Sequence, residues 1–263
     1  MARSYAFQRL RLQPSPQHLS KGNYSALEVR NHVLNAISAT DRELIEPHLK
    51  LVTLGSGDVL FEPEQPADRV YFPNTAVLSV MMVMEDGRTV ETDTVGNESA
   101  VGILAALGAS LSVNRTLTQI PGSALVMPAA RLRQFTEDSP ALRTLLLRHA
   151  QINLAQAHQS VACNALHGVE QRLCRWLLAS QDRTDRDVVE LTQQYLATMV
   201  GVQRTTITQA LRDLTTAGLI LQGRRYIEII DRKGMEARAC ECYAAVRSTA
   251  ARVAGGDQGA KRR

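Results

Sequence analysis

Residues 192–222 read TQQYLATMVGVQRTTITQALRDLTTAGLILQ, and one glycine divides this stretch into two short helical patterns. Gly201 tolerates the positive φ that a sharp turn between two helices requires. Ala197 is small enough to let the helices cross closely, as in a helix-turn-helix. The positions that would meet between the helices are apolar: Leu196, Val200, Val202, Ile207 and Ala210. The stretch therefore predicts a helix-turn-helix unit.

The outward face of the second predicted helix has no acidic residue and many hydrogen-bond donors. Such a face suits the major groove of DNA, where base edges and phosphates offer acceptors. Arg204 can grip O6 and N7 of a guanine, and Gln209 can read an adenine. We expect the base-reading residues to be Arg204, Thr205, Thr208 and Gln209. The alternative is an ordinary helical hairpin with a solvated polar face.

Two short β-like runs around Gly223 follow, in the segment LILQGRRYIEIID. They predict a β-hairpin, or wing, whose tip could touch the sugar–phosphate backbone beside the groove. Residues 200–227 carry four arginines against one aspartate, a net charge of +3. We expect the phosphate contacts to come from Gln203, Thr206, Arg212, Arg224 and Arg225.

Upstream, residues 51–128 contain short β-rich runs separated by turn signals, including Asp86-Gly87 between two alternating runs. Asp-Gly in that position is a strong hairpin signal. Many short strands with regular turns predict an antiparallel roll or barrel. Residues 27–50 look helical, with Thr40 and Glu43 at the spacing of a capping box. The predicted fold class is α+β: an antiparallel roll, a long central helix and a C-terminal winged helix-turn-helix.

The long helix is predicted to begin after Ser139, a plausible N-cap, with Pro140 at its first position. Five residues form a heptad seam with small residues between the larger ones: Leu147, Ala150, Leu154, Ala157 and Val161. Such a seam lets two helices approach closely. A second apolar row, Leu142, Leu145, Ile152 and Leu166, can pack on the chain's own roll. We therefore expect a homodimer through the first row, the alternative being a helix that is buried only within its own chain.

The predicted organisation has five parts: a disordered basic tail at 1–25, a sensor-like roll at 26–138, a dimerisation helix at 139–167, a winged helix-turn-helix at 168–238 and a C-terminal tail at 239–263.

No apolar run approaches the roughly 18–20 residues of a membrane span, so no membrane association is expected. The first twenty residues lack the apolar core of a secretory signal. The four cysteines do not form a disulfide framework for a chain of 263 residues, which favours a reducing cytoplasm.

The order of these parts, together with the segment LTQQYLATMVGVQRTTITQALRDLTTAGLI, resembles the Crp/Fnr family of bacterial transcription regulators. The resemblance implies a cyclic-nucleotide-binding-like roll, a homodimer joined through the long helix, palindromic double-stranded promoter DNA and RNA polymerase as partners. Arg204 occupies the family's first base-reading position. Thr205 stands where many members carry glutamate, and Gln209 where many carry arginine, so the family's best-known half-site is not transferred to this chain.

The roll's effector site departs from the family pattern in the segment VGNESAVGILAALGASLSVNRTLTQ. Arg115-Thr116 matches the family's phosphate-binding pair, but aligning Gly102 leaves Ile103 where the ribose-binding glutamate belongs. Cyclic AMP binding in the usual mode is therefore not expected. Gly102, Arg115 and Thr116 are the candidate pocket for another small effector of unknown identity, with bracing of the roll by Arg115 as the alternative.

No cofactor or metal site is expected. The family's iron–sulfur members use cysteines that are mostly N-terminal, whereas the first cysteine here is Cys163. Cys240 and Cys242 are too close in sequence for a CxxC loop, and the other thiols lie on separate elements. His149, His158 and His167 are nine residues apart, which places successive ones on opposite sides of a helix. We expect structural or incidental cysteines, with a thiol switch as the alternative.

The chain lacks the nucleotide-binding and hydrolytic motifs that would indicate an enzyme. The remaining rival is a ligand-binding module that controls a partner protein without binding DNA.

As a regulator, the dimer would present two recognition helices about 34 Å apart. An effector would shift their spacing by rotating the C-terminal domains about a hinge near Gly168.

Overall fold

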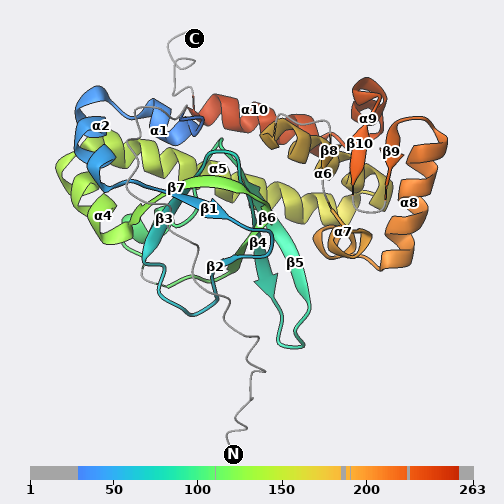
Figure 1. The fold of residues 1–263 in the computed structure, drawn as a ribbon, viewed down its shortest axis with the longest axis horizontal. Coiled ribbons are helices and arrows are strands. Elements are labelled where there is room, and N and C mark those ends of the chain that lie inside the picture. Colours follow the sequence, from blue (N-terminus) through green and yellow to red (C-terminus); the bar gives the residue numbers. More distant parts are fainter. Residues whose placement is uncertain (1–28, 110, 185–187, 190, 224–225, 255–263) are drawn as a thin grey trace, which may run out of the picture.

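The computed structural model describes residues 29–109, 111–184, 188–189, 191–223 and 226–254, and Figure 1 shows their arrangement. A β-roll lies on one side of a long helix, and a smaller α+β domain lies at the end of that helix. This is the predicted fold class. The predicted N-terminal tail falls outside the described residues.

Two antiparallel sheets form the roll. One has the order β1-β7-β3 and the other the order β2-β6-β4-β5. The strands are β1 (Lys50–Leu54), β2 (Val59–Phe61), β3 (Arg69–Pro73), β4 (Val77–Val83), β5 (Thr89–Val95), β6 (Arg115–Ile120) and β7 (Gly122–Pro128). The turn between β4 and β5 contains Gly87 at φ 83°, which confirms the predicted Asp86-Gly87 hairpin. Alternate side chains from both sheets, among them Leu54, Tyr71 and Leu78, meet in the roll's core.

Short helices close one end of the roll and pack on its first sheet. They are α1 (His32–Ala36), α2 (Ala39–Ile45), the 3₁₀ turn η2 (Glu46–His48), α3 (Ile103–Ala106) and α4 (Ala129–Asp138). The predicted capping residue is wrong by two positions. Ser38, rather than Thr40, caps α2 by accepting from the Asp41 backbone N–H, because the helix already begins at Ala39.

The long helix α5 runs from Pro140 to Leu166, and Ser139 caps it by accepting from the Leu142 backbone N–H at 3.2 Å. Of the second apolar row, Leu142 and Ile152 are buried in the chain, Leu145 is partly buried and Leu166 is 77% exposed. Leu166 is the last residue of the helix, beyond the part that the roll covers.

The C-terminal domain begins with α6 (Val169–Thr184) and contains the two helices of the motif, α7 (Gln193–Val200) and α8 (Arg204–Thr216). Its small antiparallel sheet has the order β8-β10-β9, from β8 (Val188–Val189), β9 (Ile220–Gln222) and β10 (Ile227–Ile229). Helix α9 (Arg232–Arg238) follows the sheet.

The segment 239–263, predicted to be a C-terminal tail, contains the helix α10 (Cys242–Ala254). This helix lies along α5 in Figure 1, and its Ala245, Val246 and Thr249 face Ile152 and Gln156 of α5. The alanine-rich run from Cys242 to Ala254, free of glycine and proline, has high helix propensity.

The roll and the C-terminal domain share a hydrophobic core. Val77, Met81 and Ile120 of the roll belong to the same buried cluster as Leu177 and Met199 of the C-terminal domain.

The described helices are each too short or too polar to span a lipid bilayer.

Candidate nucleic-acid interface and interdomain cavity

The turn between α7 and α8 has the geometry that the sequence predicts. Gly201 ends α7 at φ 69° and ψ 40°, in the left-handed region, and the Val202 backbone N–H donates to the Ala197 carbonyl at 2.9 Å. Leu196, Val200, Ile207 and Ala210 are buried, and Val202 is partly buried. A side chain at position 201 would strain the turn, because L-residues rarely adopt this φ.

The outer face of α8 is open to solvent. The exposed members of the predicted set are Gln203, Arg204, Thr205, Thr206, Gln209 and Arg212. Within the described part of the chain, no carboxylate pairs with Arg204 or Arg212. No side chain caps the N-terminus of α8, so its first backbone N–H groups can also serve an anion.

Two of the predicted base-reading residues already have partners inside the chain. The Thr208 hydroxyl is half-buried and donates to Oε1 of Gln193 at 2.8 Å, which fixes α8 against α7. The Gln209 amide donates to Oδ1 of Asp213 at 2.9 Å, one turn along the same helix. Gln209 can read a base only after this exposed hydrogen bond opens. Arg204, which pairs with no carboxylate among the described residues, can contact DNA without such a change.

The wing is formed by β9 and β10, whose ends are joined by a hydrogen bond from the Gly223 N–H to the Tyr226 carbonyl at 2.9 Å. The predicted phosphate contacts Arg224 and Arg225 lie outside the described residues.

The predicted dimer seam forms an apolar stripe along the solvent side of α5. Leu147, Leu154 and Val161 are 51%, 56% and 65% exposed, which is unusual for large apolar side chains on a long helix. Ala150 and Ala157, between them, are partly buried. Helix α10 packs on a different side of α5, around Ile152 and Gln156, and so leaves the stripe uncovered.

The three residues of the predicted effector pocket are structurally engaged. Nε of Arg115 donates to Oε2 of Glu62 at 2.9 Å, and Thr116 is buried on β6. Gly102 begins α3 at φ 83°, where a Cβ would lie 2.2 Å from the Arg69 carbonyl oxygen. The glycine therefore has a packing role whether or not a ligand binds.

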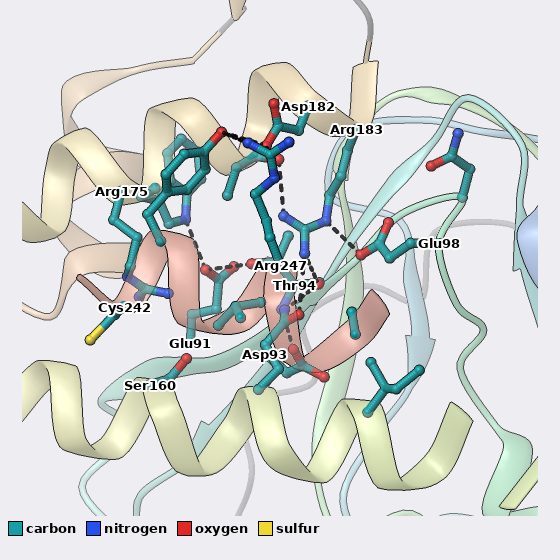
Figure 2. Close-up of a pocket in the computed structure, with 18 of the residues that line it drawn as sticks. Glu91, Asp93, Thr94, Glu98, Ser160, Arg175, Asp182, Arg183, Cys242 and Arg247 are labelled. Carbon is teal, nitrogen blue, oxygen red and sulfur yellow. Dashed lines mark hydrogen bonds and ion pairs between the residues drawn. The ribbon is translucent and has the colours of Figure 1, made fainter. Parts of the chain in front are cut away.

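A cavity of about 710 Å³ lies elsewhere, between the roll, α5, α6 and α10. Its lining comes from β5 (Glu91, Asp93), from α6 (Asp182, Arg183) and from α10 (Arg247), as Figure 2 shows. Gly102, Arg115 and Thr116 are not part of its wall. No local sequence pattern indicates this cavity, because its walls meet only when the two domains dock.

Ion pairs and hydrogen bonds join the two domains across this cavity. Arg183 of α6 donates to Oε1 of Glu98 at 2.7 Å and to the Thr94 carbonyl at 2.9 Å (Figure 2). Glu91 accepts from the Trp176 indole N–H at 2.8 Å. Burial raises the pKa of Glu91 despite this bond, and it raises the pKa of Asp93 well above its usual range.

Replacing Asp93 with asparagine is expected to stabilise the protein increasingly as pH rises. Burial raises the pKa of Asp93, with Arg183 opposing and Glu98 and Glu91 reinforcing the shift. An acid whose folded-state pKa is raised contributes stability that is fully present below its unfolded pKa, about 3.9, and is lost as pH rises through the folded value. Asparagine cannot ionise, so the variant does not lose this stability as pH rises. Urea unfolding at a series of pH values from 4 to 8 would measure the difference between variant and wild type.

Asp68→Asn is the matched control, because the Asp68 side chain is 72% exposed. Its stability should follow the wild type at every pH. A constant difference between Asp93→Asn and wild type across the range would show that Asp93 does not carry the proton in the folded state.

A compact group of sulfur and nitrogen ligands lies near the end of α5. The side chains of Cys163, His167, Cys240 and Cys242 have donor atoms that are all within 4.8 Å of one another. The expectation that the chain has no metal site finds no support in this arrangement, because the fold brings the end of α5 and the start of α10 together. The i, i+4 pair Cys163 and His167 is the sequence signal that was missed.

Comparison with protein-family models gives two matches. Residues 51–139 match a cyclic nucleotide-binding domain, and residues 171–238 match a Crp-like helix-turn-helix domain. The first range covers β1 to α4, and the second covers most of α6 through α9.

Curated relatives are similar over most of their length. A CRP-like cAMP-activated global transcriptional regulator of Mycobacterium tuberculosis is 26% identical over 78% of this chain and 92% of its own. A global nitrogen regulator of Nostoc sp. is 25% identical over 67% of this chain and 83% of its own. Among solved structures, FixK2 from Bradyrhizobium japonicum has the same fold, with a TM-score of 0.64 and 16% identity over 73% of this chain and 98% of that one.

Proposed function

The chain belongs to the Crp/Fnr family of transcription regulators, and from this premise we propose that it acts as a homodimer that binds palindromic promoter DNA. The observation that carries the proposal is the exposed face of α8, rich in donors and free of acids at its N-terminal end. Regulators of this family are not enzymes, and the residue roles proposed below are binding roles.

On this proposal, α8 enters the major groove with its N-terminal turn toward the bases. Arg204 reads a guanine, with Thr205, Thr208 and Gln209 completing the base contacts. Gln203, Thr206 and Arg212 bind phosphates, and the wing arginines Arg224 and Arg225 do the same beside the groove. Thr208 contributes mainly by holding α8 in place, because its hydroxyl is already bonded to Gln193.

The dimer is proposed to form through the apolar stripe of Leu147, Leu154 and Val161, with Ala150 and Ala157 allowing close approach. An exposed apolar stripe at heptad spacing fits a second copy of the same helix. The two-fold axis along α5 would place the two α8 helices on one face of a duplex, about one helical turn apart.

We propose the interdomain cavity as the site of a small effector. Its volume suits a small molecule, and both domains line it. A ligand that bridges β5, α6 and α10 would favour one domain arrangement over another, as population shift requires. Gly102, Arg115 and Thr116 remain a second candidate. The usual cyclic AMP mode is disfavoured there, because Ile103 stands where the family's glutamate belongs.

Transcription regulation implies RNA polymerase as a further partner and the cytoplasm as the site of action, and both are part of the proposal. The rival function is a ligand-binding module that controls another protein. The two functions differ in how strongly binding depends on salt concentration. DNA binding releases counterions and weakens steeply with salt, whereas an apolar protein contact does not.

Selection from randomised duplex DNA with the purified protein is expected to enrich a two-fold symmetric site. The log of its affinity should fall linearly with the log of salt concentration. The selection is run with and without a small-molecule extract of the producing cells. Enrichment that needs the extract indicates an effector. Failure to enrich any symmetric site in either arm would favour the rival function.

A further inference from the structure

Four ligand side chains meet where α5 ends. Cys163 lies in the last turns of α5, and His167 is the C-cap of the same helix. Cys240 lies in the connection between α9 and α10, and Cys242 is the first residue of α10, more than seventy residues later in the chain. The three cysteines form a buried cluster of their own, with exposed fractions of 0%, 4% and 1%.

The distances within this group suit a single ion. Sγ of Cys163 and Sγ of Cys240 are 3.5 Å apart, and Sγ of Cys242 is 3.5 Å from Nδ1 of His167. Bonds of about 2.3 Å from one zinc ion to two sulfurs at the tetrahedral angle place those sulfurs roughly 3.8 Å apart. All four donor atoms lie within 4.8 Å of one another, so small movements bring them onto one tetrahedron.

The surrounding hydrogen bonds orient these ligands. Nε2 of His167 lies 3.1 Å from Oε2 of Glu241, which leaves Nδ1 directed at the cysteines. Carboxylates commonly hold metal-binding histidines in this way, fixing the tautomer and strengthening the ligand. The amide of Gln159 donates to Sγ of Cys242 at 3.0 Å, which orients this sulfur as well.

Positive charge interacts with this group of side chains. The guanidinium of Arg175 interacts electrostatically with Cys163. Arg172 also interacts electrostatically with Cys163, while its guanidinium is held by the Val200 carbonyl at 2.9 Å. Three thiolates and a neutral histidine around a divalent ion leave one net negative charge, which these two arginines can balance.

We propose that Cys163, His167, Cys240 and Cys242 form a closed tetrahedral site for Zn²⁺. Three cysteines and one histidine are a common ligand set of structural zinc sites, in which all four positions come from the protein. Soft thiolates with one imidazole favour zinc over magnesium or calcium, which prefer oxygen ligands. An iron–sulfur cluster has its own irons and sulfides to enclose, and ligands this close together leave room for one ion.

The proposed site fastens α10 to α5 beside Gly168. Tyr243, Val246 and Arg247 of α10 form one wall of the interdomain cavity, so zinc would hold that wall in place. Tyr243 also donates to Oδ2 of Asp182 on α6 at 2.7 Å. The ion thus joins the dimerisation helix, the C-terminal helix and, through Tyr243, the DNA-binding domain.

The direct test is the metal content of the full-length protein purified under reducing conditions without added metal. We expect one zinc per chain by mass spectrometry of the elements. Cys242→Ser should lose the zinc, whereas Cys174→Ser, at a buried cysteine of α6 outside the cluster, should keep it. Chelator treatment should lower the Tm of the wild type, and one equivalent of Zn²⁺ should restore it.

A second measurement does not depend on the fold of a cysteine variant. Wild-type protein stripped of metal is titrated with Co²⁺ and should develop the absorption bands of tetrahedral thiolate-bound cobalt at one equivalent. Glu241→Gln should keep the site but weaken zinc affinity by roughly 10–100-fold in a chelator competition. Wild-type protein that holds neither zinc nor cobalt would overturn the proposal. So would a bound iron–sulfur chromophore, or a Cys163–Cys240 disulfide in freshly isolated protein.

Discussion

Replacing Leu154 with glutamate is expected to convert the proposed dimer to a monomer and to abolish binding to palindromic DNA. Leu154 lies at the middle of the exposed stripe between Leu147 and Val161. In a two-fold dimer each copy contributes one glutamate to the same seam. Burying an unpaired carboxylate costs several kcal/mol, and symmetry doubles that cost. The dimer Kd should therefore rise on the order of a thousandfold or more.

Sedimentation equilibrium at micromolar concentration would measure the change in mass. Leu44→Glu is the matched control, because Leu44 is also a leucine on a helix and is 53% exposed, but lies on α2, away from the stripe. The control should remain a dimer with wild-type DNA affinity. If Leu154→Glu sediments as a dimer, the subunits meet through another surface.

The second large effect is expected from Arg204→Ala, which should weaken specific DNA binding and relax one base position in each half-site. Arg204 is the first residue of α8, exposed and without a carboxylate partner among the described residues. A bidentate arginine–guanine contact gives about 1–3 kcal/mol of discrimination. A dimer makes the contact twice, so the loss on a full palindrome is about 2–6 kcal/mol.

Arg212→Ala tests whether the effect of Arg204→Ala comes from base reading or only from the loss of one positive charge. Arg212 lies two turns further along the same face of α8, and we assign it to a phosphate. Its removal should weaken binding to all sequences alike and reduce the salt slope by about one per half-site. Selected sites should stay unchanged for Arg212→Ala and become degenerate at one position for Arg204→Ala. The same selected sequence from both variants would show that Arg204 does not read a base.

Features set by neighbouring residues could be predicted from the sequence. The left-handed turn at Gly201, the N-cap at Ser139 and the Asp86-Gly87 hairpin each depend on a few adjacent residues with strong conformational preferences. The apolar pattern of the helix-turn-helix is equally local. These features suffice for the fold class and for the DNA-binding face. The Thr40 capping prediction failed for a related reason, since Ser38 offers a second hydroxyl two residues earlier.

Features made by distant segments could not be predicted in the same way. Cys163 and Cys240 become neighbours only after α10 packs on α5, and helix spacing relates His167 to Cys163 but not to Cys240 or Cys242. The cavity likewise requires the docking of β5 against α6. Asp93 and Glu91 look like ordinary polar residues of a strand in the sequence, and the docked domain is what buries them.

The shared hydrophobic cluster means that the two halves of this protein are poor independent modules. Cutting the chain at Gly168 would expose Trp176 and Met199, which contact Glu91 and Ser79 of the roll, on one fragment, and Val77 and Met81 on the other. It would also leave Glu91 without its indole donor. A chimera that joins this roll to a foreign DNA-binding domain would expose the same apolar residues of the roll and leave Glu91 without its donor. We therefore expect this roll to function on another DNA-binding domain only if that domain presents an equivalent apolar surface.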